Sequence, residues 1–139
     1  MTPKEEVEVV LNAIIPFAEE QLKKNKTFYP FGMVMLNDGS VAQTICEFEV
    51  DHPQSMDVIN RIKEIHSNDA KNNIIKISGI CWDSKIELAN GKKTDAMCVR
   101  LEHIDNYSIE LYKPYSFSLF GKLQTSNILA QKGNREIFE

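Results

Sequence analysis

Apolar residues near the start of the chain recur at the spacing of one helix face. These residues are Val7, Val10, Leu11, Ile14, Phe17, Ala18 and Leu22. The positions between them are mostly polar, which is typical of an amphipathic helix. Thr2, Pro3 and Glu5 form a capping-box pattern, so the helix is predicted to begin there. Because Pro16 removes an amide donor, we expect a kink or break at that residue and an end by Asn25.

Two β-rich runs, residues 31–36 and 41–50, flank the segment 37–40. That segment contains Asp-Gly, which tolerates the positive φ angles of a tight hairpin turn. A first β-hairpin is therefore predicted. Pro53 can open a second helix that has one apolar stripe and a charged opposite face. The stripe consists of Met56, Val58, Ile59, Ile62 and Ile65.

A run rich in β-branched residues, 74–82, predicts a central strand, which residues 86–88 extend. Asn-Gly within 90–93 supplies a turn into a further pair of strands. Matching the apolar faces of that pair sets Leu101 against Ile109, Val99 against Leu111 and Arg100 against Glu110. This register requires the three-residue loop 104–106, because a two-residue loop would oppose an apolar residue to Glu110. Asn106 can take the left-handed position of such a loop, and we expect the Arg100–Glu110 pair to be exposed.

The predicted fold class is α+β, an antiparallel sheet of about five strands with two main helices. The element order is helix, strand, strand, helix, strand, strand, strand. The 139 residues match the usual size of one domain, and a hydrophobic fraction of 42% with a charged fraction of 26% is typical of a globular protein. We expect a single domain over 1–139, in which the segment 117–139 shows no clear period and is left unassigned.

The charge and the cysteine content narrow the function classes. A net charge of -4 argues against a nucleic-acid partner, because neutralising phosphates requires concentrated Lys and Arg. The first residues are acidic and polar where a signal peptide would be basic and then apolar, and no apolar run approaches the length of a membrane span. Three cysteines without C-x-x-C spacing fit a reducing compartment. We therefore expect a cytoplasmic protein without a membrane partner.

A zinc site is one chemical hypothesis, since the chain contains three histidines and three cysteines. None of these residues lies two to four positions from another. Cys46, Cys81 and Cys98 all fall in predicted strands, where a free cysteine usually behaves as a small buried hydrophobe. We expect structural cysteines, no metal site and no cofactor.

A Cys98, His103 and Asp95 catalytic triad is a second hypothesis, and strand geometry argues against it. The eight steps from Asp95 to His103 span about 26 Å in a strand, far beyond hydrogen-bond reach. Cys98 and His103 lie five steps apart and therefore point to opposite faces. We reject the triad and expect no catalytic residues.

The favoured polar site lies at one end of this hairpin, where the register places Asp95 opposite Tyr115, with Thr94 and Pro114 beside them. The structural alternative is that Asp95 accepts hydrogen bonds from a turn amide or from the Tyr115 hydroxyl.

At the other end of the hairpin, Glu102, His103 and Asp105 could hold a proton or a cation. The structural alternative is an exposed acidic loop, which usually holds only water.

The segment 28–32, Phe-Tyr-Pro-Phe-Gly, precedes the first strand. Tyr29 and Phe31 could form a rim for a stacked ligand or an edge that binds a partner. The structural alternative is a hydrophobic clasp between helix and sheet, in which Gly32 permits close approach.

A set of motifs resembles a family of small bacterial proteins of unknown function. The motifs are Phe-Tyr-Pro-Phe-Gly at 28–32, Asp-Gly at 38–39, Lys-Thr-Asp-Ala at 93–96, Leu-Glu-His at 101–103 and Pro-Tyr at 114–115. The resemblance covers roughly residues 28 to 115 and implies a bacterial, cytoplasmic protein without adding catalytic residues. The element order also resembles that of profilin-like and roadblock-like domains, which implies a binding or scaffolding role.

These observations favour a non-enzymatic protein-binding module of the immunity or accessory type, with an unknown protein partner and homodimer formation left open. The alternative is a small enzyme or ligand-binding protein. It would use Thr94, Asp95, Tyr115 and the nearby aromatic residues. A concave polar pocket near Asp95 would favour the alternative, and an exposed apolar patch or sheet edge would favour a protein partner.

Overall fold

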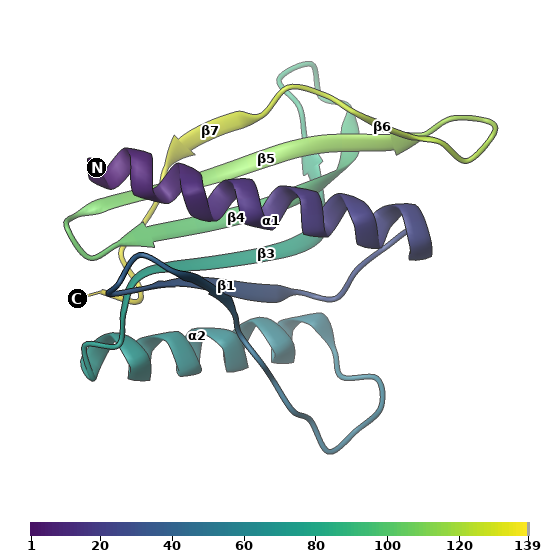
Figure 1. Ribbon diagram of the computed structural model, residues 1–139. Coiled ribbons are helices and arrows are strands. Elements are labelled where there is room, and N and C mark those ends of the chain that lie inside the picture. Colours follow the sequence, from purple (N-terminus) through teal and green to yellow (C-terminus); the bar gives the residue numbers. More distant parts are fainter. Residues whose placement is uncertain (139) are drawn as a thin grey trace.

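The computed structural model describes residues 1–138 and has seven antiparallel strands and two helices (Figure 1). In chain order, the elements are α1 (Pro3–Asn25), β1 (Phe31–Leu36), β2 (Val41–Gln43), α2 (Ser55–Lys71), β3 (Ile75–Glu87), β4 (Lys93–His103), β5 (Tyr107–Phe117), β6 (Leu123–Thr125) and β7 (Leu129–Lys132). The sheet order is β2-β1-β3-β4-β5-β6, and β7 also pairs with β5. The α+β class and the predicted element order are confirmed, although the strand number is higher than expected.

Helix α1 begins with the predicted capping box. The Thr2 hydroxyl accepts the Glu5 N–H, and the Glu5 carboxylate accepts the Thr2 N–H. The predicted break at Pro16 is wrong, because the helix is continuous to Asn25. Pro16 lies on the exposed side, while Ile14, Ile15 and Ala18 around it are buried. Burial of this face offsets the roughly 3 kcal/mol that an interior proline costs.

The two helices cover opposite faces of the sheet, as adjacent residues of β3 demonstrate. A Cβ added to Gly79 would lie 2.8 Å from Ile14 of α1, so the absence of a side chain there lets α1 approach closely. The next residue, Ile80, packs with Val58 and Ile62 of α2. Because successive side chains of a strand point to opposite faces, α1 and α2 must lie on different sides of the sheet.

The apolar stripe of α2 differs from the prediction at both ends. The helix begins at Ser55 after the N-cap Gln54 and not at Pro53, and Met56 is exposed. Val58, Ile59 and Ile62 are buried as predicted. The stripe then continues into a histidine, His66, which is fully buried.

The first hairpin has a shorter second strand than predicted, because β2 ends at Gln43 and not at residue 50. Its partner β1 begins at Phe31, directly after Pro30, which has no N–H to donate to a ladder. Because β1 and β2 are antiparallel, residues that follow β2 would have to pair with residues at and before the start of β1, where the ladder cannot continue. Residues 44–54 are irregular and carry the exposed Ile45 and Val50. The prediction that Cys46 lies in a strand is wrong for the same reason.

The β4–β5 hairpin has the predicted register, including Leu101 opposite Ile109 and Arg100 opposite Glu110. Loop 104–106 joins the strands, and Asn106 has the expected positive φ of 63°. Strand β3 has 13 residues, and the predicted extension of the central strand into residues 86–88 is confirmed as far as Glu87. The expectation of an exposed Arg100–Glu110 pair is wrong, because both side chains are largely buried, with Arg100 also contacting Glu136 at 3.1 Å.

The segment left unassigned from the sequence contains two further strands within the described residues. It forms β6 and β7 along the outer edge of β5, and then residues 133–138 pass back toward α2. Ile137 and Phe138 are buried against Val34 and Ile75. Neither helix within residues 1–138 is long and apolar enough to cross a membrane.

Candidate functional site

The predicted pairing of Asp95 with Tyr115 is confirmed. It lies at the end of the sheet where β3 and β5 finish and β4 begins. The last turn of α1 and the β5–β6 turn, residues 118–122, lie at the same end (Figure 1). We call this region the Asp95 end. It contains Thr94, Asp95 and Tyr115, whereas Tyr29 and Phe31 lie just before and at the start of β1, where Phe31 is paired with Cys81 and is level with Val99 of β4.

Asp83, which the sequence analysis did not single out, organises this end. The Tyr115 hydroxyl donates to Asp83 Oδ1 at 2.6 Å, and the Thr27 hydroxyl donates to Asp83 Oδ2 at 2.9 Å. Burial and the hydrogen bond to Asp83 raise the pKa of Tyr115. The carboxylate of Asp83 therefore ties the end of α1 to β3 and β5.

Asp95 does not have the partner that the structural alternative gave it. Its carboxylate accepts from Lys85 Nζ at 3.1 Å, and within residues 1–138 it accepts no hydrogen bond from a turn amide or from Tyr115. The hydroxyl of Thr94 donates to the carbonyl of Asp95. With Tyr115 buried and bonded to Asp83, these three residues do not form a nucleophile and base with access to a substrate.

Substituting the two aspartates should separate their roles. The Asp95–Lys85 pair is 46% and 73% exposed, and an exposed ion pair contributes about 0 to 1 kcal/mol. Asp95→Ala should therefore change the free energy of unfolding by less than about 1 kcal/mol. Asp83→Ala leaves the buried Tyr115 without an acceptor for its hydroxyl, as well as the exposed Thr27 hydroxyl, and should cost about 1 to 3 kcal/mol. Urea denaturation of both variants measures this difference, and equal midpoints would contradict it.

The aromatic segment is mainly a clasp. The rings of Phe28 and Phe31 are buried, and each meets a neighbour edge-to-face, with Phe31 lying 4.8 Å from Phe17. Tyr29 is half exposed, and its hydroxyl lies 3.4 Å from His52 Nδ1. Tyr29 and Phe31 line a cavity of about 620 Å³ beside α1. The lining of this cavity does not include Thr94, Asp95 or Tyr115, so the candidate residues are not united in one pocket.

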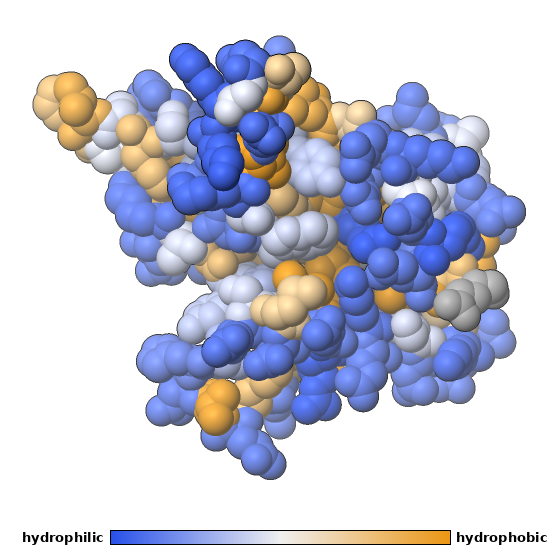
Figure 2. Space-filling model, turned by 180° about the vertical axis from the view of Figure 1, so that it is seen from behind, coloured by the Kyte–Doolittle hydropathy of each residue, from blue (hydrophilic) through white to orange (hydrophobic). Residues whose placement is uncertain are grey.

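The β5–β6 turn presents two large apolar side chains to solvent. Leu119 and Phe120 are 102% and 98% exposed. Figure 2 shows hydrophobic atoms protruding where this turn lies, at the upper left in the view from behind. We call Leu119 and Phe120 the apolar tip. The sequence analysis missed it, although the segment Phe-Ser-Leu-Phe-Gly, 117–121, ends in a glycine that is a turn signal.

The apolar tip is held in a defined position. Gly121, with a φ of 77°, closes the turn by donating its N–H to the Ser118 carbonyl. Lys26, the C-cap of α1, donates to the Gly121 carbonyl at 2.7 Å. The same ammonium lies 4.3 Å from the centre of the Phe117 ring, a cation–π distance. The turn is thus attached to the helix as well as to its own strands.

The remaining candidates, Glu102 and His103, do not form a common site. Both are only 1% exposed, so the expectation of an exposed acidic loop is wrong for them. Glu102 accepts backbone N–H groups of residues 136–138. His103 points to the other face, where Nε2 lies 3.0 Å from Glu6 and Nδ1 accepts the Asp105 N–H. A backbone donor at Nδ1 places the proton of the neutral ring on Nε2.

His66 forms a second buried polar group that the sequence analysis missed. Its Nδ1 lies 2.7 Å from the Ser78 hydroxyl, and its Nε2 lies 2.6 Å from the Thr44 hydroxyl. Burial lowers the pKa of His66 to about 4. The neutral ring can donate to one hydroxyl and accept from the other. The signal was its spacing, since His66 follows Ile59 and Ile62 on one helix face.

The cysteines show no sign of activation. Cys81 and Cys98 are buried, and burial raises the pKa of both, that of Cys98 to about 12. A thiol with a raised pKa is a poor nucleophile and metal ligand at neutral pH. Within residues 1–138, no three His, Cys, Asp or Glu side chains lie close enough together to hold a metal ion.

No protein-family model, curated protein or solved structure matches this chain.

Proposed function

We propose that the protein is a non-enzymatic protein-binding module and that the apolar tip is its main contact with a partner. The observation that carries this proposal is the full exposure of two large apolar side chains on a turn that Lys26 fixes to α1. Adjacent exposed apolar side chains that form a contiguous patch mark interaction sites, whereas single scattered ones are normal on a surface. In this proposal the protein is a cytoplasmic bacterial accessory or immunity-type module.

The geometry of the tip supports a role as an anchor. Leu119 and Phe120 would lose nearly all their exposure on entering a pocket, and burying one such side chain is worth about 1.5 to 3 kcal/mol. Because the turn is already closed by hydrogen bonds, little additional backbone ordering is required on binding. Side chains that fill a partner's pocket commonly dominate the affinity of an interface.

The charge around the tip indicates the chemistry of the partner. Four exposed lysines, Lys23, Lys24, Lys26 and Lys122, lie in the last turn of α1 and in the β5–β6 turn. Lys24 is paired with Glu20 at 3.1 Å, and the other three lysines give this end a local excess of positive charge on a chain whose net charge is -4. A partner with an apolar pocket and an acidic rim would complement this end, and opposite potentials would speed the encounter.

The enzyme or ligand alternative has less support. Its proposed residues are occupied by internal contacts, with Tyr115 bonded to Asp83 and Asp95 to Lys85. The lining of the 620 Å³ cavity consists of aromatic, proline, amide and hydroxyl side chains, and no Asp, Glu, His, Lys or Cys side chain of the described residues belongs to it. A catalytic pocket is expected to contain such a group.

A double serine substitution tests the role of the tip. Leu119→Ser with Phe120→Ser should leave the unfolding midpoint unchanged, because fully exposed side chains contribute little to stability. The variant should lose most of the partner that the immobilised wild-type protein retains from an extract of the source organism. Raising the salt concentration should weaken wild-type binding, since the surrounding lysines are exposed.

The matched control is Ile45→Ser, which removes an apolar side chain that is 83% exposed in the irregular segment 44–54. This variant should retain the partner. Equal retention by the double variant and the wild type would refute the proposal. Binding of the wild type to vesicles of anionic lipid, lost in the double variant, would assign the tip to a membrane surface instead and would likewise refute it.

A further inference from the structure

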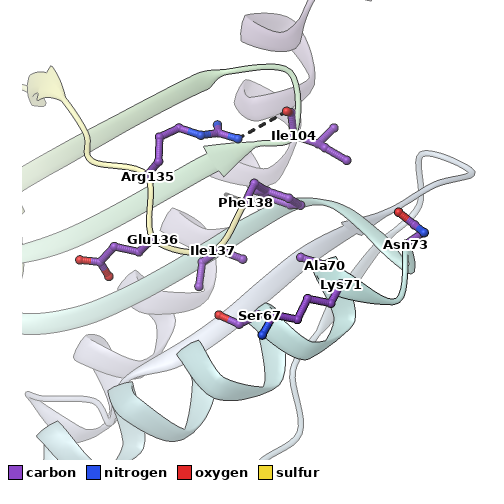
Figure 3. Close-up of a pocket in the computed structure, with 9 residues that line it drawn as sticks. All are labelled: Ser67, Ala70, Lys71, Asn73, Ile104, Arg135, Glu136, Ile137 and Phe138. Carbon is purple, nitrogen blue, oxygen red and sulfur yellow. Dashed lines mark hydrogen bonds between the residues drawn. The ribbon is translucent and has the colours of Figure 1, made fainter.

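Residues 133–138 lie in a groove between the sheet and the last turns of α2 (Figure 3). They follow β7 but form no helix or strand. Gly133 continues the pairing of β7 with β5, because its N–H donates a hydrogen bond to the Ser108 carbonyl. The contacts beyond it come from side chains and carbonyls of other elements. The segment is bent at residues 136 and 137 and is therefore held mainly by contacts to other elements.

The main chain of this segment is recognised by one buried carboxylate. Glu102 Oε2 accepts the N–H of Ile137 at 2.8 Å and that of Phe138 at 2.9 Å, and Oε1 accepts the N–H of Glu136. Glu102 is 1% exposed, and among the described residues its side chain accepts hydrogen bonds from these three amides. A carboxylate that is removed from water in this way needs such donors. The groove thus requires a segment that presents three consecutive free amides.

The side chains of the segment are recognised by separate contacts. Ile137 and Phe138 pack into the cluster formed by Val34 and Ile75, with Leu36, Ala42 and Ala70 at its edge. Glu136 pairs with Lys63 at 3.0 Å and with Arg100 at 3.1 Å. The arrangement selects an acidic residue followed by two apolar ones, the second aromatic.

The groove extends beyond the part that the segment fills. A cavity of about 490 Å³ lies beside Ile137 and Phe138, and its wall includes the polar side chains of Ser67, Lys71 and Asn73. These polar groups could accommodate further residues of a peptide. On the opposite side, Arg135 donates to the carbonyls of His103 and Ile104 and fixes where the segment enters.

We propose that this groove is a peptide-binding site that residues 133–138 occupy within the chain. Its ligand class is a peptide with an acidic, an aliphatic and an aromatic residue in succession, bent so that three consecutive N–H groups face one carboxylate. A partner protein that carries such a segment would bind by displacing residues 133–138. This site is separate from the apolar tip and does not depend on the function proposed for it.

Restoration in trans tests the proposal in the full-length protein. Ile137→Ser with Phe138→Ser should lower the thermal midpoint by weakening the bound segment. A synthetic peptide with the sequence of residues 133–138, Gly-Asn-Arg-Glu-Ile-Phe, should then raise the midpoint in a saturable manner. The same peptide with serine in place of Ile and Phe should have no effect. Adding Glu102→Gln to the variant should weaken peptide binding about tenfold or more, since a carboxylate accepts amides more strongly than a neutral amide oxygen does.

The double serine variant must keep its circular dichroism spectrum for this test. If it does not fold, Phe138→Ala in the full-length chain takes its place, with binding of the fluorescein-labelled peptide measured by anisotropy. A folded variant that shows neither a midpoint shift nor an anisotropy change at millimolar peptide would overturn the proposal. The segment would then be a packed part of the fold without a separable binding site.

Discussion

Replacing Glu102 with Ala is expected to lower the free energy of unfolding by about 3 kcal/mol or more. The substitution leaves three consecutive backbone amides, those of residues 136–138, without their acceptor, and the amides of Ile137 and Phe138 are buried. An unsatisfied buried donor costs about 1 to 3 kcal/mol, and part of that cost is recovered if the segment detaches and becomes hydrated. Detachment then exposes Ile137 and Phe138, which adds a loss of apolar burial. Urea denaturation measures the total effect.

Two further variants place this result in context. Glu102→Gln keeps one acceptor oxygen and should lose less stability than Glu102→Ala. Glu87→Ala removes an exposed strand glutamate and should change the midpoint little. A Glu102→Ala midpoint equal to that of Glu87→Ala would show that the carboxylate does not hold the segment.

His66 is expected to make the protein less stable as the pH falls from about 7 to 4. Burial lowers the pKa of His66 to about 4 in the folded protein, from an ordinary value of 6.5. The unfolded chain therefore binds a proton at His66 that the folded chain does not bind in this pH range, which favours unfolding. The loss of stability begins as the pH falls through 6.5. It reaches its full size of about 3 kcal/mol below about pH 4. Stability above pH 7 does not change through this group.

The contribution of His66 can be separated from that of the carboxylates, which also titrate in acid. His66→Gln removes the titrating ring, so the difference between variant and wild type should shrink or reverse as the pH falls from 7.5 to 4.5. His52→Gln, at an exposed histidine, should follow the wild type at every pH. A constant difference between His66→Gln and wild type would contradict the assignment of a buried neutral histidine.

The hairpin register could be predicted because it depends on a local rule. The apolar faces of β4 and β5 match in only one register, since a shift of one residue moves every side chain to the other face. The same rule placed Asp95 opposite Tyr115. It could not identify Asp83 as the partner of Tyr115, because that contact joins β5 to β3, whose register against β4 the sequence did not specify.

Tertiary packing explains the parts that local patterns missed. Pro16 should break an isolated helix, but the contact of α1 with the sheet stabilises the continuous helix. Glu102 and His103 sit near a loop and have polar side chains, so exposure was the natural prediction. Glu102 is buried by residues 133–138, more than 30 positions away, and His103 is paired with Glu6, 97 positions away. No short-range pattern contains either contact.

The exposure of the apolar tip was not predicted for a different reason. A short apolar run next to a glycine predicts burial or a turn, and sequence alone does not decide which residues of the turn face solvent. Here the contact of Lys26 with Gly121 and Phe117 fixes the turn, and Leu119 and Phe120 project from it. Exposure of the tip follows from the position of the α1 end, which is a property of the whole fold.

Photo-crosslinking from the tip tests the proposed binding function most directly. A benzophenone amino acid at position 120, introduced into the protein in cells of its source organism, should give on irradiation a discrete adduct with one partner protein. The same amino acid at position 45, which is also highly exposed, should not give that adduct. An adduct at twice the mass of the chain would identify the partner as a second copy. No discrete adduct from position 120, or the same adducts from both positions, would contradict the role of the apolar tip.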